Sequence, residues 1–424
     1  MCDGQKSLSE ILKDYDSDSQ KVILEFLGNL RQIGAVCFTK EKNPREFPDL
    51  VLDPQLQSVH FELTSRCNMR CRHCYQESYL RQPTDLTFEE IQKLVREMRK
   101  LQVEKIGISG GEPFMRPDLF EIIRIIEENE IAISSILTNG LSLNNKVIEK
   151  LLKCQGQLSL FVSLDGMKPE AMKLRGFGPD QCEQVFNRLI GNIQNAVKAG
   201  IPIMINTVVT KDNVVNICQM YDWLKEMEVI GWRIALPKLA GSFTKHQSEF
   251  ALPREKVFEE YLKIIKRHLE TENWKNNNFR LQIEHFFRVE VFENLEILPP
   301  TAFVCDYEGK RQSCCIKPNG DVTPCPLYID LVVGNLRKQS LESIWYSKTM
   351  QQIKDIRICD VKGCQFCHLS WLCATGCRAN AIFLHDSREA PDDDACAAVK
   401  FFIDQVAPML RENGIKLPEI QERR

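Results

Sequence analysis

Short apolar runs alternate with longer amphipathic segments between Val59 and Leu239. The short runs predict strands at residues 59–64, 105–109, 131–138, 158–164, 202–209 and 232–236. The longer segments predict helices at residues 87–101, 117–129, 145–154, 182–199 and 214–227. The first of these helices has Thr87 as its N-cap, and Glu90 completes a capping box. Six β/α units of this length predict a parallel sheet with right-handed crossovers, but too few strands for a closed eight-stranded barrel.

The flanks of this α/β region have different patterns. Residues 21–36 carry an apolar helical stripe, which Gly34 is expected to end before a short strand at residues 36–39. Residues 252–294 are polar and predicted to be helical. From residue 299 onward Cys, Gly and Pro interrupt the chain, which is typical of a small domain organised by clusters rather than by a large core. The predicted parts are a helical appendage (1–55), an α/β domain (56–245), a helical bridge (246–300) and a cysteine-rich domain (301–424).

Composition and charge exclude several kinds of partner. Of the 424 residues, 43% are hydrophobic and 27% are charged, which is ordinary for a globular protein. The net charge of −3 provides no broad basic surface for nucleic acid or an acidic membrane. The N-terminus has no apolar signal-peptide core, and no apolar run reaches the roughly 18 residues of a membrane span. We therefore expect a cytoplasmic protein that binds neither nucleic acid nor membrane.

Cysteine carries the clearest chemical signal. The chain has 18 cysteines, and in a cytoplasmic protein metal ligation explains them better than disulfides do. Cys67, Cys71 and Cys74 follow the first predicted strand as a C-x3-C-x2-C run. Three thiolates can hold three irons of a [4Fe–4S] cluster and leave the fourth iron open to a ligand that is not protein. A zinc site normally has four ligands in paired knuckles, and no fourth Cys or His completes this set nearby.

This run resembles the signature of the radical S-adenosylmethionine (SAM) enzymes. A second signature, Ser109-Gly110-Gly111-Glu112-Pro113, ends the second predicted strand, at the edge where α/β sheets bind ligands. The resemblance implies a partial six-stranded (β/α)6 TIM-like barrel. It implies that the open iron chelates the amino and carboxylate groups of SAM, and that the GGEP motif holds the amino group. Further cofactor contacts are expected from Ser163, Arg175, Asn206 and Arg233, with the backbone at His73 meeting the adenine.

The C-terminal cysteines form a second pattern. Cys305, Cys325 and the run Cys364-x2-Cys367-x5-Cys373-x3-Cys377, followed by Cys396, resemble the seven-cysteine SPASM domain of radical SAM enzymes with auxiliary clusters. The resemblance implies one auxiliary cluster on Cys305, Cys325 and Cys377, and a second on Cys364, Cys367, Cys373 and Cys396. Two complete clusters need eight thiolates, so Cys315 or Cys314 is a candidate for the eighth. An iron left open to the substrate is the alternative.

The resemblance also implies the reaction type. A reduced cluster cleaves SAM to a 5′-deoxyadenosyl radical, which abstracts hydrogen from the substrate, and a flavodoxin or ferredoxin supplies the electron. The first expected function is modification of a ribosomally synthesised peptide or protein, with residues 1–55 either docking a leader peptide or serving as a plain cap. Pro326 follows Cys325 where a sulfatase-maturing enzyme would have an Asp base, which argues against formylglycine formation.

Two other functions are left open. One is side-chain modification of a small molecule such as a tetrapyrrole of the haem pathway, whose propionates would need basic residues. Lys238, Lys245 and His246 follow the sixth predicted strand and are candidates for that role. The other is a non-catalytic iron–sulfur electron carrier, although such a protein has no use for the GGEP motif or for an open iron.

Overall fold

The computed structural model describes residues 7–13, 15–32, 55–76, 84–154, 156, 158–250, 252–271, 279–283, 287–288, 298–305, 311–329 and 331–417. The chain divides into two compact units, Met1–Pro54 and Gln55–Arg424. The first contains α1 (Leu8–Leu12) and α2 (Ser17–Gln32), and a capping box of Ser7 and Glu10 begins α1. The strand predicted at residues 36–39 lies outside the described residues.

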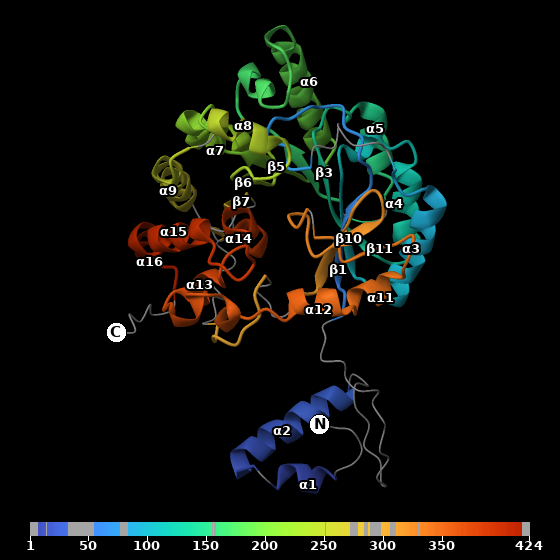
Figure 1. The fold of residues 1–424 in the computed structure, drawn as a ribbon, viewed down its shortest axis with the longest axis vertical. Coiled ribbons are helices and arrows are strands. Elements are labelled where there is room, and N and C mark those ends of the chain that lie inside the picture. The colour runs from blue at the N-terminus through green and yellow to red at the C-terminus, as the bar shows by residue number, and fades with distance from the viewer. Residues whose placement is uncertain are drawn as a thin grey trace. The chain divides into compact units, whose positions relative to one another are not determined.

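The second unit is built on a sheet of mostly parallel strands (Figure 1). Its centre is β1 (Ser58–Glu62), β2 (Lys105–Ser109), β3 (Ala132–Thr138), β4 (Leu160–Ser163), β5 (Ile203–Val208) and β6 (Gly231–Ala235). Each pairs in parallel with the next, so all six carboxyl ends meet at one edge. The sheet order does not close on itself, and the predicted partial barrel is confirmed.

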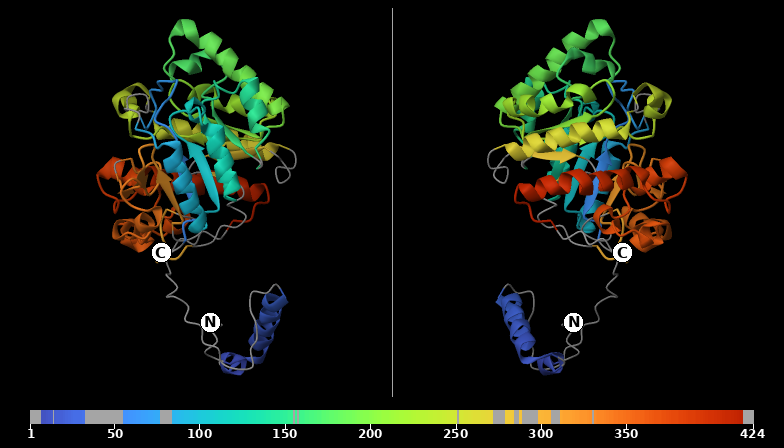
Figure 2. Two further views of the ribbon diagram at one scale, coloured as in Figure 1. Left: turned by 90° about the vertical axis from the view of Figure 1, so that its right-hand side faces the viewer. Right: turned by 90° about the vertical axis from the view of Figure 1, so that its left-hand side faces the viewer.

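Helices connect these strands and cover the sheet (Figures 1 and 2). In α3, Thr87 Oγ1 accepts the Glu90 amide at 3.2 Å and Glu90 Oε2 accepts the Thr87 amide at 2.8 Å, which confirms the predicted capping box. The apolar face of α3 is buried through Ile91, Leu94, Val95 and Met98. The connecting helices are α3 (Phe88–Lys100), α4 (Leu119–Glu128), α5 (Asn145–Leu151), α6 (Pro179–Lys198) and α7 (Met220–Glu226), with 3-10 turns at Pro113–Met115, Pro169–Lys173 and Val214–Gln219.

Strands from outside the six predicted units extend the sheet at both edges. The helix predicted over residues 252–294 is correct only for its first half. α8 (Ser242–Phe250) is followed by α9 (Arg254–Glu270). Farther along the chain, β7 (Arg280–Ile283) pairs in parallel with β6, and β8 (Phe287–Arg288) pairs antiparallel with β7. Tertiary structure explains why residues 280–283 form a strand instead of the predicted helix. The outer edge of β6 has backbone N–H and C=O groups that need partners, and this short strand supplies them.

The C-terminal part begins by adding a strand to the opposite edge. β9 (Ser313–Ile316) pairs in parallel with β1, and β10 (Asp321–Thr323) and β11 (Gly334–Asn335) follow antiparallel. Short helices follow: α11 (Leu341–Trp345), α12 (Lys348–Lys354), α13 (Ser370–Cys373), α14 (Arg378–His385), α15 (Asp393–Phe401), a π-helical turn (Phe402–Val406) and α16 (Ala407–Glu412). The cysteine-rich segment is therefore joined to the barrel by the sheet itself.

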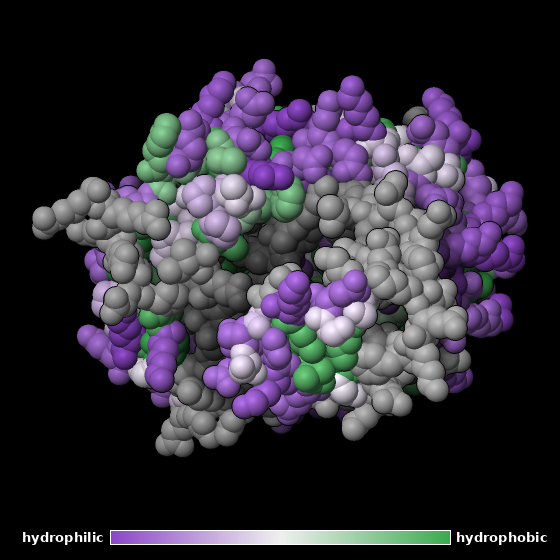
Figure 3. All heavy atoms as spheres, turned by 90° about the horizontal axis from the view of Figure 1, so that it is seen from below, coloured by the Kyte–Doolittle hydropathy of each residue, from purple (hydrophilic) through white to green (hydrophobic). Residues whose placement is uncertain are grey.

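Hydrophilic side chains cover most of the described surface on the face drawn in Figure 3, and apolar side chains show there in small patches. Within the described ranges, no helix is both long and apolar enough to cross a membrane.

Candidate active site

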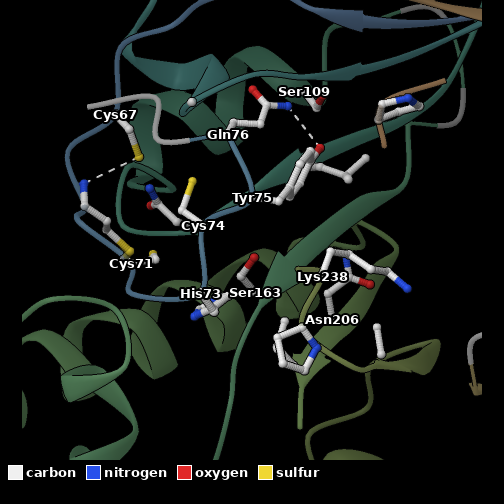
Figure 4. A pocket seen from close by; sticks show the side chains of 18 of the residues that line it. Cys67, Cys71, His73, Cys74, Tyr75, Gln76, Ser109, Ser163, Asn206 and Lys238 are labelled. Carbon is white, nitrogen blue, oxygen red and sulfur yellow. Dashed lines mark hydrogen bonds between the residues drawn. The ribbon is translucent and has the colours of Figure 1, made fainter. Parts of the chain in front are cut away.

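A cavity of about 490 Å³ lies at the carboxyl ends of the parallel strands. Its wall includes Cys67, Cys71 and Cys74, which lie together on one side, while Asn206 and Lys238 lie on another (Figure 4). The loop after β10 adds residues 325–327, so the cysteine-rich segment also forms part of the wall. Among the described residues that line the cavity there is no Asp or Glu.

The two glycines of the GGEP motif bring the end of β2 into backbone contact with the cysteine loop. A Cβ on Gly111 would lie 2.2 Å from the carbonyl oxygen of Arg66, and one on Gly110 would lie 2.5 Å from that of Thr64. Gly110 also has φ of +144°, a conformation that other residues rarely adopt. The Gly111 amide donates to the Thr64 carbonyl at 2.7 Å. The motif therefore fixes the position of the cysteine loop.

Two further glycines approach the same loop from other elements. A Cβ on Gly176, in the turn before α6, would lie 2.4 Å from the carbonyl oxygen of Arg70. A Cβ on Gly241, just before α8, would lie 2.4 Å from that of Tyr75. Both have positive φ, of +89° and +58°. Sequence reasoning missed their role, because only the folded chain brings them to the loop.

Glu112 and Pro113 do not line the cavity, although the sequence predicts a cofactor contact for both. The Glu112 side chain is fully buried and ties the end of β2 to the end of β3. It accepts hydrogen bonds from Thr138 Oγ1 and from the Asn139 amide, both at 2.7 Å, and from the Phe114 amide at 3.2 Å. Burial raises the pKa of Glu112 to about 7, although these donors oppose the shift.

Arg175 lines the cavity beside the cysteines and is paired with Asp165. Its Nη2 lies 2.8 Å from Asp165 Oδ2, and both side chains are almost completely buried. Burial raises the pKa of Cys71 to about 12, and the guanidinium of Arg175 opposes this shift. Burial lowers the pKa of His73 to about 4, so its imidazole is neutral at physiological pH. The pair of Arg175 and Asp165 brings no net charge to the cysteine loop.

Ser163, Asn206 and Arg233 all line the cavity and are neighbours in the sheet. Ser163 on β4 is in register with Asn206 on β5, which is in register with Arg233 on β6. Asn206 Oδ1 is buried and has no hydrogen-bond partner among the described residues. A buried amide oxygen without a partner is costly unless a ligand supplies the donor.

A buried polar network links β1 and β9 to the cavity. Glu62 forms an ion pair with Lys317 Nζ at 2.9 Å and accepts a hydrogen bond from Gln76 Nε2. Gln76 Nε2 also donates to the Tyr75 hydroxyl at 3.0 Å (Figure 4). The Cys315 thiol donates to Glu62 Oε1 at 3.5 Å. All three contacts go to Glu62 Oε1, whereas Oε2 is buried and has no hydrogen-bond partner among the described residues. Through Gln76, this network holds Tyr75 and Gln76 in the cavity wall.

The seven C-terminal cysteines fall into two electrostatic neighbourhoods. Burial raises the pKa of Cys377 to about 11, and Cys325 and Cys305 add to the shift. Burial raises the pKa of Cys373 to about 12, with contributions from Cys364, Cys396 and Cys367. We call these sets the 305–325–377 group and the 364–367–373–396 group. Their members are those of the two sets that the resemblance to SPASM domains implies, and their role as cluster ligands stays a prediction.

The thiols fit iron–sulfur clusters better than single metal ions. In the described parts of the chain, no three Cys, His, Asp or Glu side chains are placed to hold one metal ion. A cubane presents its irons at separate corners, so its thiolates stand farther apart than the ligands of one ion. Gly110 and Gly111 present backbone to the cavity, and Asn206 Oδ1 offers a ligand there an acceptor. These features suit a cluster at Cys67, Cys71 and Cys74 with SAM beside it.

Comparisons with known proteins agree with this chemistry. The model of the radical SAM superfamily matches residues 61–224. The model of the SPASM iron–sulfur cluster-binding domain matches residues 305–368.

Similar proteins include both tetrapyrrole and peptide enzymes. The AdoMet-dependent heme synthase of Methanosarcina barkeri is 29% identical over 76% of this chain and 91% of the relative. The mycofactocin maturase MftC of Mycobacterium ulcerans is 26% identical over 79% of this chain and 86% of the relative. The structure of Streptococcus suis SuiB bound to precursor peptide SuiA has a TM-score of 0.63 at 19% identity, covering 89% of each chain. At that identity, the structural likeness shows a shared fold.

Proposed function

We propose that this chain, which belongs to the radical SAM superfamily and carries a C-terminal SPASM domain, modifies a ribosomally synthesised peptide or protein. It is an enzyme that uses SAM, a [4Fe–4S] cluster and auxiliary iron–sulfur clusters. The observation that carries the proposal is that Cys67, Cys71 and Cys74, the Gly110–Gly111 turn and Cys325 all line one cavity. The peptide substrate is supported by likeness to a maturase that covers most of both chains.

When bound, the cluster and SAM supply hydrogen-atom abstraction by a 5′-deoxyadenosyl radical. Cys67, Cys71 and Cys74 would hold the cluster, and the Gly110–Gly111 turn would let SAM approach the backbone closely. Glu112 would act indirectly, because its carboxylate fixes the end of β2, which carries this turn. Ser163, Asn206 and Arg233 would meet the rest of SAM from adjacent strands.

The other residues of the site orient the reactants and exclude water. The neutral pair of Arg175 and Asp165 braces the cysteine loop. The 305–325–377 and 364–367–373–396 groups would hold the auxiliary clusters, with Cys315 as the candidate for an eighth thiolate. A flavodoxin or ferredoxin would deliver the electron that starts the reaction.

A small carboxylated tetrapyrrole is the second candidate substrate. The cavity wall carries Arg233 and Lys238 but no described Asp or Glu, a charge balance that suits an anionic group. The likeness to a heme synthase over 91% of that relative supports the same candidate.

The test is a substrate competition with the reconstituted, reduced enzyme. The enzyme is incubated with SAM and either short peptides encoded beside its gene or an iron tetrapyrrole bearing propionates. We expect one peptide to change mass in step with 5′-deoxyadenosine release. A change in the tetrapyrrole with every peptide unmodified would overturn the peptide assignment in favour of the second candidate.

A further inference from the structure

Each of the three cysteine groups has one buried arginine beside it. Arg175 is 4% exposed, Arg311 is 6% exposed and Arg378 is fully buried. Arg311 donates to the carbonyl of Cys305. Arg378 donates to the carbonyl of Thr375, two residues after Cys373. In all three arginines Nε is buried and has no hydrogen-bond partner among the described residues. Three unsatisfied guanidinium donors, one at each thiol group, point to a common role.

The two C-terminal arginines are anchored by neutral groups. Arg311 donates from Nη1 to the Pro324 carbonyl at 2.9 Å and from Nη2 to the Cys305 carbonyl at 3.5 Å. Its contacts therefore bracket two cysteines of the 305–325–377 group. Within the described ranges, no ion pair joins Arg311 to a carboxylate.

Arg378 has the same kind of anchoring at the second group. Its guanidinium donates to the Arg388 carbonyl at 3.0 Å and to the carbonyls of Thr375 and Ala390. The buried carboxylate of Asp392 lies in the same region, where it accepts from the Cys377 amide at 2.8 Å and caps α15; within the described residues no ion pair joins it to Arg378.

Arg175 differs in one respect, because Asp165 cancels its charge. A buried cation that lacks a counter-charge is costly, whereas a cluster ligated by thiolates is anionic and would compensate it. A positive charge and an N–H donor beside a cluster stabilise the more negative, reduced form. The reduction potential of that cluster then rises.

We propose that Arg311 and Arg378 raise the reduction potentials of the two auxiliary clusters above the potential of the cluster at Cys67, Cys71 and Cys74. This inference rests on the proposed assignment of the cysteines to clusters. The arginines are not ligands. They act through their charge and through a buried Nε–H that has no partner among the described residues, and they favour the auxiliary clusters as the place where an electron resides.

The test measures potentials rather than turnover. In redox titrations followed by electron paramagnetic resonance, Arg311→Gln should shift the reduced-to-oxidised equilibrium of one auxiliary cluster at least tenfold toward the oxidised form. This corresponds to about 59 mV for one electron. Arg378→Gln should shift the other cluster, and the Lys variants should shift less because they keep the charge. Arg116→Gln is the matched control, because Arg116 is also buried and donates to the Leu63 and Leu86 carbonyls.

Iron content separates the outcomes. Gln variants with full iron and redox equilibrium constants within twofold of wild type would overturn the inference and leave the proposed function intact. If the Gln variants lose iron, Asp165→Asn decides, because it uncovers the charge of Arg175. It should shift the redox equilibrium of the first cluster about tenfold toward the reduced form, which raises its potential by about 59 mV. No change in that potential would overturn the inference. If Ala variants of the C-terminal cysteines retain wild-type iron, the cluster assignment fails and the inference fails with it.

Discussion

Gly111→Ala is the sharpest test of how the GGEP motif positions the cysteine loop. The added Cβ would lie 2.2 Å from the Arg66 carbonyl oxygen and 2.6 Å from its carbon, whereas real contacts essentially never fall below 3.0 Å. The neighbours are backbone atoms, so no side-chain rotation can relieve the clash. The loop or the strand end must move by about 0.8 Å, the difference between the first distance and that limit.

This displacement has two expected costs. Forced overpacking of a buried contact destabilises a protein by roughly 1–3 kcal/mol. A misplacement of about 1 Å near reacting groups can lower a rate by roughly 100-fold. We therefore expect Gly111→Ala to lose iron from the Cys67, Cys71 and Cys74 group and to release 5′-deoxyadenosine about 100-fold more slowly than wild type.

Gly191→Ala is the matched control. Gly191 lies inside α6, and a Cβ there would meet nothing within 4 Å. Alanine favours a helix over glycine by roughly 0.5–1 kcal/mol, so this variant should be slightly stabilised and fully active. The assays are iron content per chain, 5′-deoxyadenosine release and urea unfolding of the iron-free protein. Gly111→Ala with wild-type iron and a rate within twofold of wild type would refute the steric argument.

Three further predictions follow from the same geometry. Because burial raises the pKa of Glu112 from 4.5 to about 7, its contribution to the free energy of unfolding is complete below pH 4.5. That contribution falls by about 3 kcal/mol as the pH rises to 7. Urea unfolding of the iron-free protein should therefore show a free energy of unfolding that decreases with pH for wild type, and Glu112→Gln should lose this decrease. Arg175→Ala leaves Asp165 buried without its partner, so urea unfolding should show a free energy of unfolding lower by about 3–5 kcal/mol. A decrease below about 1 kcal/mol would contradict the bracing role. Cys315→Ala should lower the iron content and Cys314→Ala should not, because the Cys315 thiol joins the polar network of Glu62 behind the cavity wall, whereas Cys314 is packed in the hydrophobic core. Wild-type iron in Cys315→Ala would exclude Cys315 as a ligand.

The alternation of apolar segments was sufficient to predict the central strands. β2 spans the predicted residues, β3 begins one residue later than predicted, and β5 is one residue shorter at each end. β7 was missed because its alternating residues, Arg-Leu-Gln-Ile, are only four in number and lie in a segment predicted to be helical. It is a strand because β6 presents an open edge, which only the folded sheet creates.

The cysteine and glycine motifs located the site, but the roles of its supporting residues depend on tertiary contacts. Glu112 belongs to the GGEP motif, yet its carboxylate is turned away from the cavity and satisfied by Thr138 and Asn139. Asp165, in the motif that ends β4, gave no sign that it would pair with Arg175. Arg311 and Arg378 lie close to cysteines in the sequence, but only the folded chain shows that both arginines are buried without a carboxylate partner among the described residues.

The most direct test of the central claim is the cleavage of SAM. The reconstituted protein is reduced with dithionite, given SAM, and assayed for 5′-deoxyadenosine and methionine. Wild-type protein should form both products, and the variant in which Cys67, Cys71 and Cys74 are all Ala should form neither. A wild-type protein with full iron that forms no 5′-deoxyadenosine with any substrate would contradict the central claim.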